Sequence, residues 1–374
     1  MTTPYLALFT ADWQLCNSLP HSRSLDNGET DRLQDQCNVI EQIGAIAKEY
    51  HVDGIYVLGD VFERRLLDAI TLRTGLEAVL LLTSIAPIYL LPGNHDVNTP
   101  RGGRNLLEAF EVIEHEKIYY LDNRQQGDDG FVFTSPYDPP VRFFAIPWGP
   151  LSEVKELIDF CRSQVSKKEV SVLLLHQGIN GCTDGGWACD NELDPDETCE
   201  GFDLVLAGHF HDRQKFGSCG EYVGAPMQHD FRDAGSGRRG VVLVEFSEHL
   251  TKKFIEIDSP QFHVRKVTRD SRVLTDPVPV KGDYLRIDVE ATQQEWRTWL
   301  PDIEKYANEL REIGVNVLPP KHVPIAQIET RLGKSTPSFL EAASGYVKLA
   351  NTEGLNPKRL MEIASETLNE VENG

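Results

Sequence analysis

Short apolar runs alternate with longer stretches of helical periodicity over residues 1–210, and this alternation restricts the fold more than any other feature of the chain. The apolar runs are predicted strands at residues 5–10, 54–58, 87–91, 141–146, 170–175 and 204–207. Predicted helices occupy residues 31–50, 66–84, 103–114 and 151–164. Because strands that alternate with helices form sheets covered by helices, the sequence predicts an α/β fold.

The pattern changes after residue 208, where strands follow one another at residues 221–223, 240–246, 253–257 and 262–267. An all-β stretch after α/β units predicts a second sheet packed on the first. The expected architecture is therefore a layered sandwich of two mixed β-sheets flanked by helices.

A composition shift near residues 275–282, with Pro277, Pro279 and Gly282, marks a predicted domain boundary. Beyond it, a strand at 284–289, a helix at 295–313 and a strand at 315–318 predict a small α/β cap, and residues 338–374 carry two helical patterns. We expect a main domain at 1–275, a cap domain at 276–335 and a C-terminal helical tail at 336–374.

Composition places the chain among folded globular proteins, with 40% hydrophobic and 25% charged residues. The sequence has no run of 18 apolar residues and no basic segment at residues 1–15, so neither membrane spanning nor secretion is expected. Seven cysteines, an odd number, suit free thiols in a reducing, cytoplasmic setting. The net charge of −21 argues against broad electrostatic adhesion to DNA, unless bound cations or local basic loops attract the phosphates.

Five polar clusters follow the ends of predicted strands. In chain order they are Asp12-Trp13-Gln14, Gly59-Asp60, Gly93-Asn94-His95-Asp96, His176 and Gly208-His209-Phe210-His211. Loops beyond the carboxyl ends of strands in α/β sheets converge on one crevice. Taken singly, each residue has a structural explanation as a turn, a helix cap or a buried histidine. Together they offer carboxylate, amide and imidazole ligands, which predict a site for two metal ions.

The five clusters resemble the motifs D-x-H, G-D, G-N-H-[DE], H and G-H-x-H of the calcineurin-like metallophosphoesterases, over roughly residues 5–270. The resemblance implies a first metal position held by Asp12 and His211, a second held by Asn94, His176 and His209, and Asp60 bridging the two. It implies two divalent ions, with Mn²⁺ as the leading choice and Mg²⁺, Fe²⁺ or Zn²⁺ as alternatives. A hydroxide generated from metal-activated water would attack the phosphorus.

Two neighbouring residues are candidates for catalysis by the same resemblance. His95 would donate a proton to the leaving oxygen, and Asp96 could orient the His95 ring. A helix or turn cap is the alternative role for Asp96.

One position departs from the family pattern, because Gln14 stands where the first motif ends in histidine. A glutamine carbonyl oxygen can bind a metal, but it is a weaker neutral ligand than imidazole for manganese or zinc. We therefore expect weaker binding at the first metal position, with lowered activity or an altered metal preference.

Within the superfamily, residues 10–13, 59–63 and 222–228 resemble the SbcD-type DNA nucleases, whose compact phage-encoded members are similar in length. That resemblance implies a hydrolase that cuts DNA as an exonuclease and endonuclease in repair or recombination. Its partners would be DNA and an SbcC-like coiled-coil ATPase of the SMC type. The cap would face DNA and the tail would bind the ATPase, and a homodimer is a further expected arrangement.

Basic residues near the motifs are candidates for DNA phosphate contacts, namely Arg64, Arg101, Arg104 and the pair Arg238-Arg239. Solvated surface arginines are the alternative. Cys182, Cys189 and Cys199 lie in an acidic segment between two motifs, without the C-x-x-C spacing of a structural zinc site. We interpret this segment as a lid or specificity loop.

Two other functions remain open at this point. The acidic charge suits a phosphodiesterase or phosphatase that acts on nucleotides or phosphoproteins. Gln14 suits a weakly active or inactive scaffold subunit that positions the ATPase and DNA.

Overall fold

The computed structural model describes residues 4–97, 105–113, 115–122, 131–134, 140–247, 249–269 and 279–325, together with Arg359. Its first sheet has the strand order β14-β13-β1-β2-β3-β4. The strands are β1 (Tyr5–Thr10), β2 (Gly54–Leu58), β3 (Ile88–Leu91), β4 (Ile118–Tyr120), β13 (Gly240–Phe246) and β14 (Thr251–Glu256). Strands β1 to β4 are parallel, and β13 and β14 add an antiparallel edge.

The second sheet has the order β11-β12-β10-β7-β6-β5. Its strands are β5 (Phe131–Thr134), β6 (Val141–Ile146), β7 (Val170–His176), β10 (Leu204–Gly208), β11 (Gln214–Phe216) and β12 (Gly220–Tyr222). The four central strands are parallel, and the edge strands β5 and β11 are antiparallel to their neighbours. The structure thus confirms the predicted sandwich of two mixed sheets.

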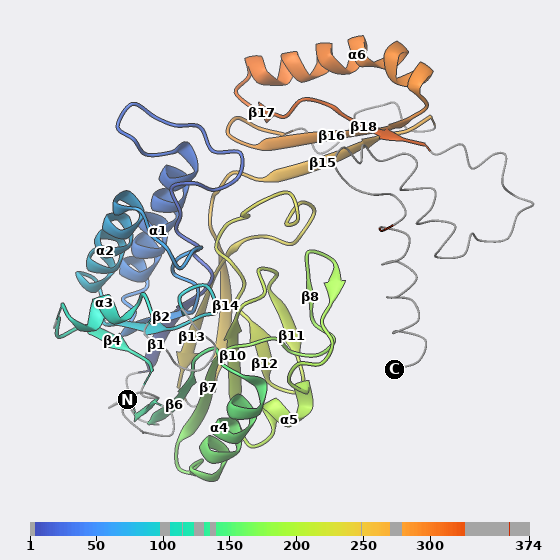
Figure 1. The fold of residues 1–374 in the computed structure, drawn as a ribbon. Coiled ribbons are helices and arrows are strands. Elements are labelled where there is room, and N and C mark those ends of the chain that lie inside the picture. Colours follow the sequence, from blue (N-terminus) through green and yellow to red (C-terminus); the bar gives the residue numbers. More distant parts are fainter. Residues whose placement is uncertain are drawn as a thin grey trace, which may run out of the picture.

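Helices cover the outer faces of both sheets (Figure 1). The helices are α1 (Asp31–Glu49), α2 (Ala69–Thr83), α3 (Glu108–Glu111), α4 (Leu151–Ser163) and α5 (Pro195–Cys199). The side chains of Thr30 and Asp68 cap the first two by accepting main-chain N–H groups, which are otherwise unsatisfied at a helix start.

Three buried apolar layers hold the sandwich together, one between the sheets and one under the helices of each side. Between the sheets, the rings of Phe9, Tyr56 and Phe143 stack with centroids 4.8 and 5.0 Å apart. Because the apolar core fixes both sheets, their strand ends are held in a constant relation to each other.

A third sheet forms a small separate layer above the body in Figure 1. It contains the parallel strands β15 (Phe262–Val267), β16 (Tyr284–Ala291), β17 (Asn316–Val317) and β18 (Lys321–Pro324), and α6 (Gln293–Glu312) covers it. Thr292 and Glu295 form a capping box at the start of α6. The small α/β cap predicted from the sequence is therefore present.

The fully buried Arg32 of α1 joins the third sheet to the body. Its guanidinium carbon lies 4.9 Å from the ring centroid of Phe262 and 5.1 Å from that of Tyr284, and it donates to the carbonyl oxygen of Gln228 at 2.8 Å. Cation–π contacts of this kind are stronger when they are removed from water.

Some strands occupy other places than the sequence predicted. Strands β13 and β14 extend the first sheet and β15 belongs to the third, whereas one second sheet was expected to collect them. Strand periodicity shows which residues are buried but not which edge a strand joins, and the free edge of β1 accepts β13. The third sheet thus draws on residues on both sides of the expected boundary near residue 275.

Other predictions concern residues that are only partly described. The expected helix at 103–114 is reduced to Glu108–Glu111 in its described part, and the tail at 336–374 lies outside the described residues apart from Arg359. In the part of the chain that the structure describes, no helix combines the length and the apolar character needed to cross a membrane.

Candidate metal centre

The five polar clusters meet at the carboxyl ends of β1, β2, β3, β7 and β10. Main-chain hydrogen bonds from Asp12 N to Gly59 O and from Gln14 N to Asp60 O, both 2.9 Å, continue the pairing of β1 with β2 into the site. Asp12, Gln14, Asp60 and His209 all have positive φ, from 47° to 103°. Such backbone strain in non-glycine residues is common where a site imposes the geometry.

Asp12, Asp60 and His176 form the centre of the site. Each offers one ligand atom, the three atoms lie within 4.8 Å of one another, and all three side chains are buried. The Nδ1 atom of His176 donates to Leu58 O at 2.7 Å, so the Nε2 atom faces the Asp60 carboxylate at 3.3 Å. A backbone partner on one ring nitrogen is the usual way to aim the other at a metal.

The side chains expected at the second metal position converge on the amide oxygen of Asn94. This oxygen lies 2.9 Å from His209 Nδ1 and 3.1 Å from His176 Nε2. The main-chain N–H of His209 donates to the Asp12 carboxylate at 3.1 and 3.2 Å, which ties the fifth cluster to the first.

Gln14 and His211, both expected at the first metal position, lie side by side. Their Nε2 atoms are 3.2 Å apart, and Gln14 is 5% exposed, so its amide lies inside the site rather than at the surface. The His211 Nδ1 atom lies 3.3 Å from Asp233 Oδ1. A carboxylate in this place orients the imidazole and increases its basicity toward a metal.

Two glycines leave the space that the ligands need. Gly59 has φ +93°, and a Cβ atom there would lie 2.0 Å from His176 Nδ1. A Cβ atom at Gly93 would lie 2.1 Å from Asp60 Oδ1. Because real Cβ atoms do not approach other atoms so closely, larger residues at these two positions would displace ligands.

His95 lies at the open side of the site, with its side chain 34% exposed. Its Nδ1 atom is 2.6 Å from Glu63 O and 3.6 Å from Glu63 Oε2, and its Nε2 atom is 4.0 Å from Asp60 Oδ2. The ring therefore presents Nε2 to the space beside the metal ligands, where a bound phosphate would be reached.

Asp96 does not orient His95 in this structure. Its buried carboxylate accepts the main-chain N–H groups of Phe62 at 3.1 Å, Gly93 at 3.0 Å and Val61 at 3.4 Å. These contacts favour the turn-capping role that the sequence left open for Asp96. Asp96 fixes the two loops that carry Asp60 and Asn94, and Glu63 holds the His95 ring.

The electrostatics of the ligands follow from burial and close opposite charges. Burial raises the pKa of Asp12 to about 6, and burial together with Asp60 raises that of Asp96 to about 7. Although burial opposes it, the charge of His176 lowers the pKa of Asp60 to about 2, and Asp60 in turn raises that of His176 to about 9. The buried carboxyls of Asp12, Asp60 and Asp96, close to the imidazoles of His176, His209 and His211, make a site suited to cations.

Three residues at the centre were not predicted from the sequence: Glu63, His229 and Asp233. The Nε2 atom of His229 lies 2.9 Å from Asp12 O, and its ring packs against that of His211 at 4.8 Å. Glu63 stood within a motif and could have been considered, whereas the loop that carries His229 and Asp233 has no local signal.

The predicted DNA-contacting arginines have different outcomes. Arg64 is exposed, with its guanidinium 3.4 Å from Ser18 O, and Arg101 and Arg104 lie outside the described residues. Arg239 is buried and paired with Asp212 at 2.9 Å, so it supports the site from within rather than presenting charge to solvent.

The fold and the grouped carboxylates and imidazoles define a metal-dependent phosphoesterase. The chain belongs to the calcineurin-like phosphoesterase family, which matches residues 6–213. Members of this family use a dinuclear site of divalent metal ions.

Relatives of the chain include proteins of DNA repair. The DNA double-strand break repair protein Mre11 of Saccharolobus solfataricus is 24% identical over 239 residues, which cover 59% of this chain and 56% of that protein. A viral protein provisionally named phosphoesterase 244L, of Invertebrate iridescent virus 6, is 24% identical over 298 residues, which cover 75% of this chain and 94% of that protein. The SbcD component of the SbcCD nuclease of Bacillus subtilis is 31% identical over 116 residues, which cover 30% of this chain and 26% of that protein.

The chain thus spans little more than half the length of the Mre11 relative. Among solved structures, a dimetal phosphatase from Danio rerio is similar with a TM-score of 0.45 and 13% identity, over 68% of this chain and 97% of that one.

Proposed function

We propose that this chain is the nuclease subunit of a cytoplasmic DNA repair or recombination complex, and that it hydrolyses DNA phosphodiester bonds as an exonuclease and endonuclease. The convergence of Asp12, Asp60 and His176, with His95 at the open side, carries the proposal. The names of the Mre11 and SbcCD relatives support DNA as the substrate. An SMC-type ATPase similar to SbcC is the proposed partner, and a homodimer is the proposed assembly.

The residues present fit two divalent ions, with manganese as the proposed metal. Asp60 would be shared, Asn94, His176 and His209 would complete the second position, and Asp12, Gln14 and His211 the first. When bound, such ions supply Lewis-acid activation of water and of the phosphate. The neutral Gln14 makes the first position the weaker one.

The chain's own part in the reaction is orientation and proton transfer. The Nδ1–H of His95 donates to Glu63 O, so Nε2 is the atom that faces the departing sugar oxygen. In the imidazolium form of the ring, which carries a second proton on Nε2, this atom would protonate that oxygen and leave the ring neutral. His176 and Asp96 do not face solvent; they hold the loops and the ligands at fixed positions.

A groove between the body and the third sheet supports DNA over a small nucleotide. It has a volume of about 410 Å³, and among its lining residues are His21, Arg23 and Arg311. Cationic and aromatic side chains in one groove suit a nucleic-acid strand, which they contact through phosphates and bases. The two arginines of this groove contrast with the net charge of −21 of the whole chain.

The proposal is tested with the full chain, with and without Mn²⁺, on labelled duplex and single-stranded DNA. The His95→Ala variant and a p-nitrophenyl phosphodiester are included, and a candidate SMC-type ATPase is added in parallel reactions. We expect metal-dependent DNA cleavage that His95→Ala removes.

Each alternative gives a different result. Hydrolysis of the p-nitrophenyl ester, nucleotides or phosphopeptides without DNA cleavage would assign the phosphodiesterase or phosphatase function. No hydrolysis under any metal, even with the ATPase, would reject the nuclease and leave the scaffold function, which Gln14 favours.

A further inference from the structure

Two pairs of cysteines lie on the side of the second sheet that α4 and α5 cover. Cys199 is the last residue of α5, and Cys219 lies in the turn between β11 and β12. Cys182 and Cys189 flank the hairpin of β8 (Thr183–Asp184) and β9 (Trp187–Ala188). None of these four belongs to the metal centre, and the proposed function uses none of them.

The sulfur atoms of Cys199 and Cys219 are held against each other's main chain. Cys219 Sγ lies 3.7 Å from Cys199 O and 3.5 Å from Phe202 O, and Cys199 Sγ lies 3.7 Å from Phe216 O. Cys219 Sγ thus lies against the backbone of Cys199 itself. The β11–β12 turn packs so closely that a Cβ atom at Gly217 would lie 2.7 Å from Cys199 Sγ.

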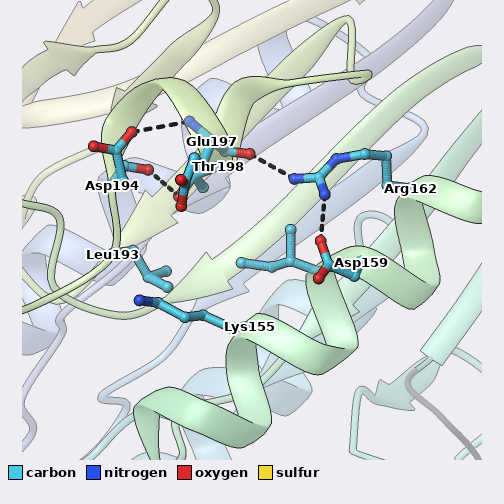
Figure 2. A pocket seen from close by; sticks show the side chains of 8 residues that line it. Lys155, Asp159, Arg162, Leu193, Asp194, Glu197 and Thr198 are labelled. Carbon is cyan, nitrogen blue, oxygen red and sulfur yellow. Dashed lines mark hydrogen bonds and ion pairs between the residues drawn. The ribbon is translucent and has the colours of Figure 1, made fainter.

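The helix that carries Cys199 is itself fixed. Arg162 of α4 donates to Glu197 O at 2.5 Å, and the Asp194 side chain accepts the N–H group of Glu197 at the helix start (Figure 2). Arg162 also donates to Glu200 O at 2.9 Å, and Asp194 also accepts the N–H group of Asp196. A short helix anchored at both ends keeps its last side chain in place. The fold therefore holds Cys199 in a fixed place, with Cys219 Sγ against its carbonyl oxygen.

The environment also activates one thiol of the pair. The pKa of Cys199 is lowered to about 6, chiefly by the thiol of Cys219. Burial opposes this shift, and the main-chain N–H groups of Cys219, Ser218 and Gly220 add to it. The thiolate that results is the nucleophile in sulfur oxidation. Cys199 is 2% exposed, whereas Cys219 is partly exposed, so the turn provides access to the pair.

We propose that Cys199 and Cys219 are a redox-active pair that is oxidised by peroxide to a reversible intramolecular disulfide. The Cys199 thiolate attacks one oxygen of hydrogen peroxide, the O–O bond breaks, and the hydroxide released takes up a proton to give water. Cys219 Sγ then attacks the Cys199 sulfenic acid, the S–O bond breaks, and a second water leaves with the Cys219 proton. Two thiols lose two electrons and one peroxide is reduced.

The proposed Cys199–Cys219 disulfide would join α5 to the β11–β12 hairpin, whose rings pack toward the metal centre. From the β11–β12 hairpin, a row of rings runs from Phe216 to Tyr222, Phe210 and His209, with successive centroids 5.2, 4.9 and 5.0 Å apart. His209 is a proposed metal ligand, but the redox pair stands on its own geometry and does not depend on the nuclease proposal.

The second pair is an internal comparison. Cys189 N donates to Cys182 O at 2.8 Å, so these residues face each other across the hairpin. Burial raises the pKa of both thiols, with a further increase from nearby acidic groups at Cys189. Thiols that remain protonated react slowly, so proximity without activation is not expected to give a disulfide first.

The test exposes the full chain, freed of reductant, to hydrogen peroxide at pH 7, followed by alkylation, trypsin digestion and mass spectrometry. Trypsin separates the two partners, because Cys199 falls in the peptide 169–213 and Cys219 in the peptide 216–232. We expect two of the seven thiols to disappear, the two peptides to become linked, and dithiothreitol to restore both.

Variants assign the pair. Cys199→Ser should abolish the link, Cys219→Ser should leave a sulfenic acid at Cys199 that dimedone labels, and Cys37→Ser on α1 should behave as wild type. Circular dichroism checks that each variant is folded. A disulfide within the peptide 169–213, formed between Cys182 and Cys189, would overturn the proposal, as would seven unreacted thiols under conditions that oxidise a peptide dithiol.

Discussion

The Nδ1 atom of His95 lies 2.6 Å from the main-chain carbonyl oxygen of Glu63, while its Nε2 atom lies 4.0 Å from the Asp60 carboxylate. Since a carbonyl oxygen can only accept, Nδ1 carries a proton, and Nε2 is free for chemistry at the site. Because the partner of Nδ1 is a main-chain carbonyl oxygen, replacing the Glu63 side chain would not remove this hydrogen bond acceptor.

His95→Ala therefore tests proton donation without disturbing the metal ligands. We expect DNA cleavage to fall on the order of 10²- to 10⁴-fold, the usual contribution of a general acid, while Mn²⁺ affinity measured by titration calorimetry stays unchanged. A p-nitrophenyl phosphodiester should lose less activity, because p-nitrophenolate leaves without protonation. The exposed His249 provides the matched control as His249→Ala. Equal losses on both substrates would contradict the assignment.

Gln14 lies inside the first metal position, 3.2 Å from His211 Nε2. Gln14→His should tighten Mn²⁺ binding at this position, on the order of tenfold or about 1.4 kcal/mol, because imidazole is the stronger ligand. Calorimetry and the Mn²⁺ electron paramagnetic resonance spectrum would separate one bound ion from two. Gln14→Ala is the control and should bind no more tightly than wild type. Unchanged binding in Gln14→His would show that the position does not limit occupancy.

The strands and motif residues could be predicted because their signals are local. Each ligand follows a buried apolar strand, and parallel strands place their carboxyl ends together. The six candidate ligands other than Gln14 were assigned by the resemblance of these motifs to the family pattern, and the structure brings them together. The role of Asp96 was left open because a carboxylate beside a turn fits both a cap and a catalytic partner.

The supporting residues could not be predicted because their partners are distant in sequence. Asp233 contacts His211 across 22 positions, and His229 contacts Asp12 across 217. Nothing in a single sequence signals such pairs. For the same reason, the sequence did not predict that β13 joins the first sheet and β15 the third. Pairing partners depend on packing rather than on periodicity.

Metal binding should release protons and strengthen as the pH rises. Asp60 raises the pKa of His176 to about 9, and Asp233 raises the pKa of His211 to about 9. Burial alone would lower both values. Both imidazoles are protonated below that pH, and a metal ligand must be neutral, so protons compete with the ion. Calorimetry in buffers of different ionisation enthalpy should show up to about two protons released at pH 7. An affinity that is constant between pH 6 and pH 9 would refute this.

The Asp233 carboxylate should matter for metal affinity although it is not a proposed ligand. Asp233→Asn keeps the shape but weakens the acceptor for His211 Nδ1, 3.3 Å away, so we expect about 10- to 100-fold weaker Mn²⁺ binding. Asp212→Asn is the matched control, because Asp212 shares the partner Arg239 but does not orient His211. A similar loss in both variants would attribute the effect to Arg239 instead.

Gly59 should be far less tolerant of substitution than a glycine of similar backbone conformation elsewhere. Gly59 and Gly181 have φ of +93° and +80°, so alanine costs each about 1–2 kcal/mol of backbone strain. Only at Gly59 would the new Cβ meet His176 Nδ1, at 2.0 Å, whereas nothing lies within 4 Å at Gly181. Overpacking adds about 1–3 kcal/mol, so denaturant unfolding should show Gly59→Ala to be less stable than Gly181→Ala by about that amount.

The same pair of variants separates stability from ligand geometry. Relief of the contact requires the His176 ring to move away from Leu58 O and Asp60, so Gly59→Ala should also lose Mn²⁺ affinity under conditions in which it is fully folded. Gly181→Ala should bind Mn²⁺ as wild type does. If the two variants bound the ion equally well, His176 would not be fixed by the close packing of Gly59, and the second metal position would depend on fewer residues than the contacts indicate.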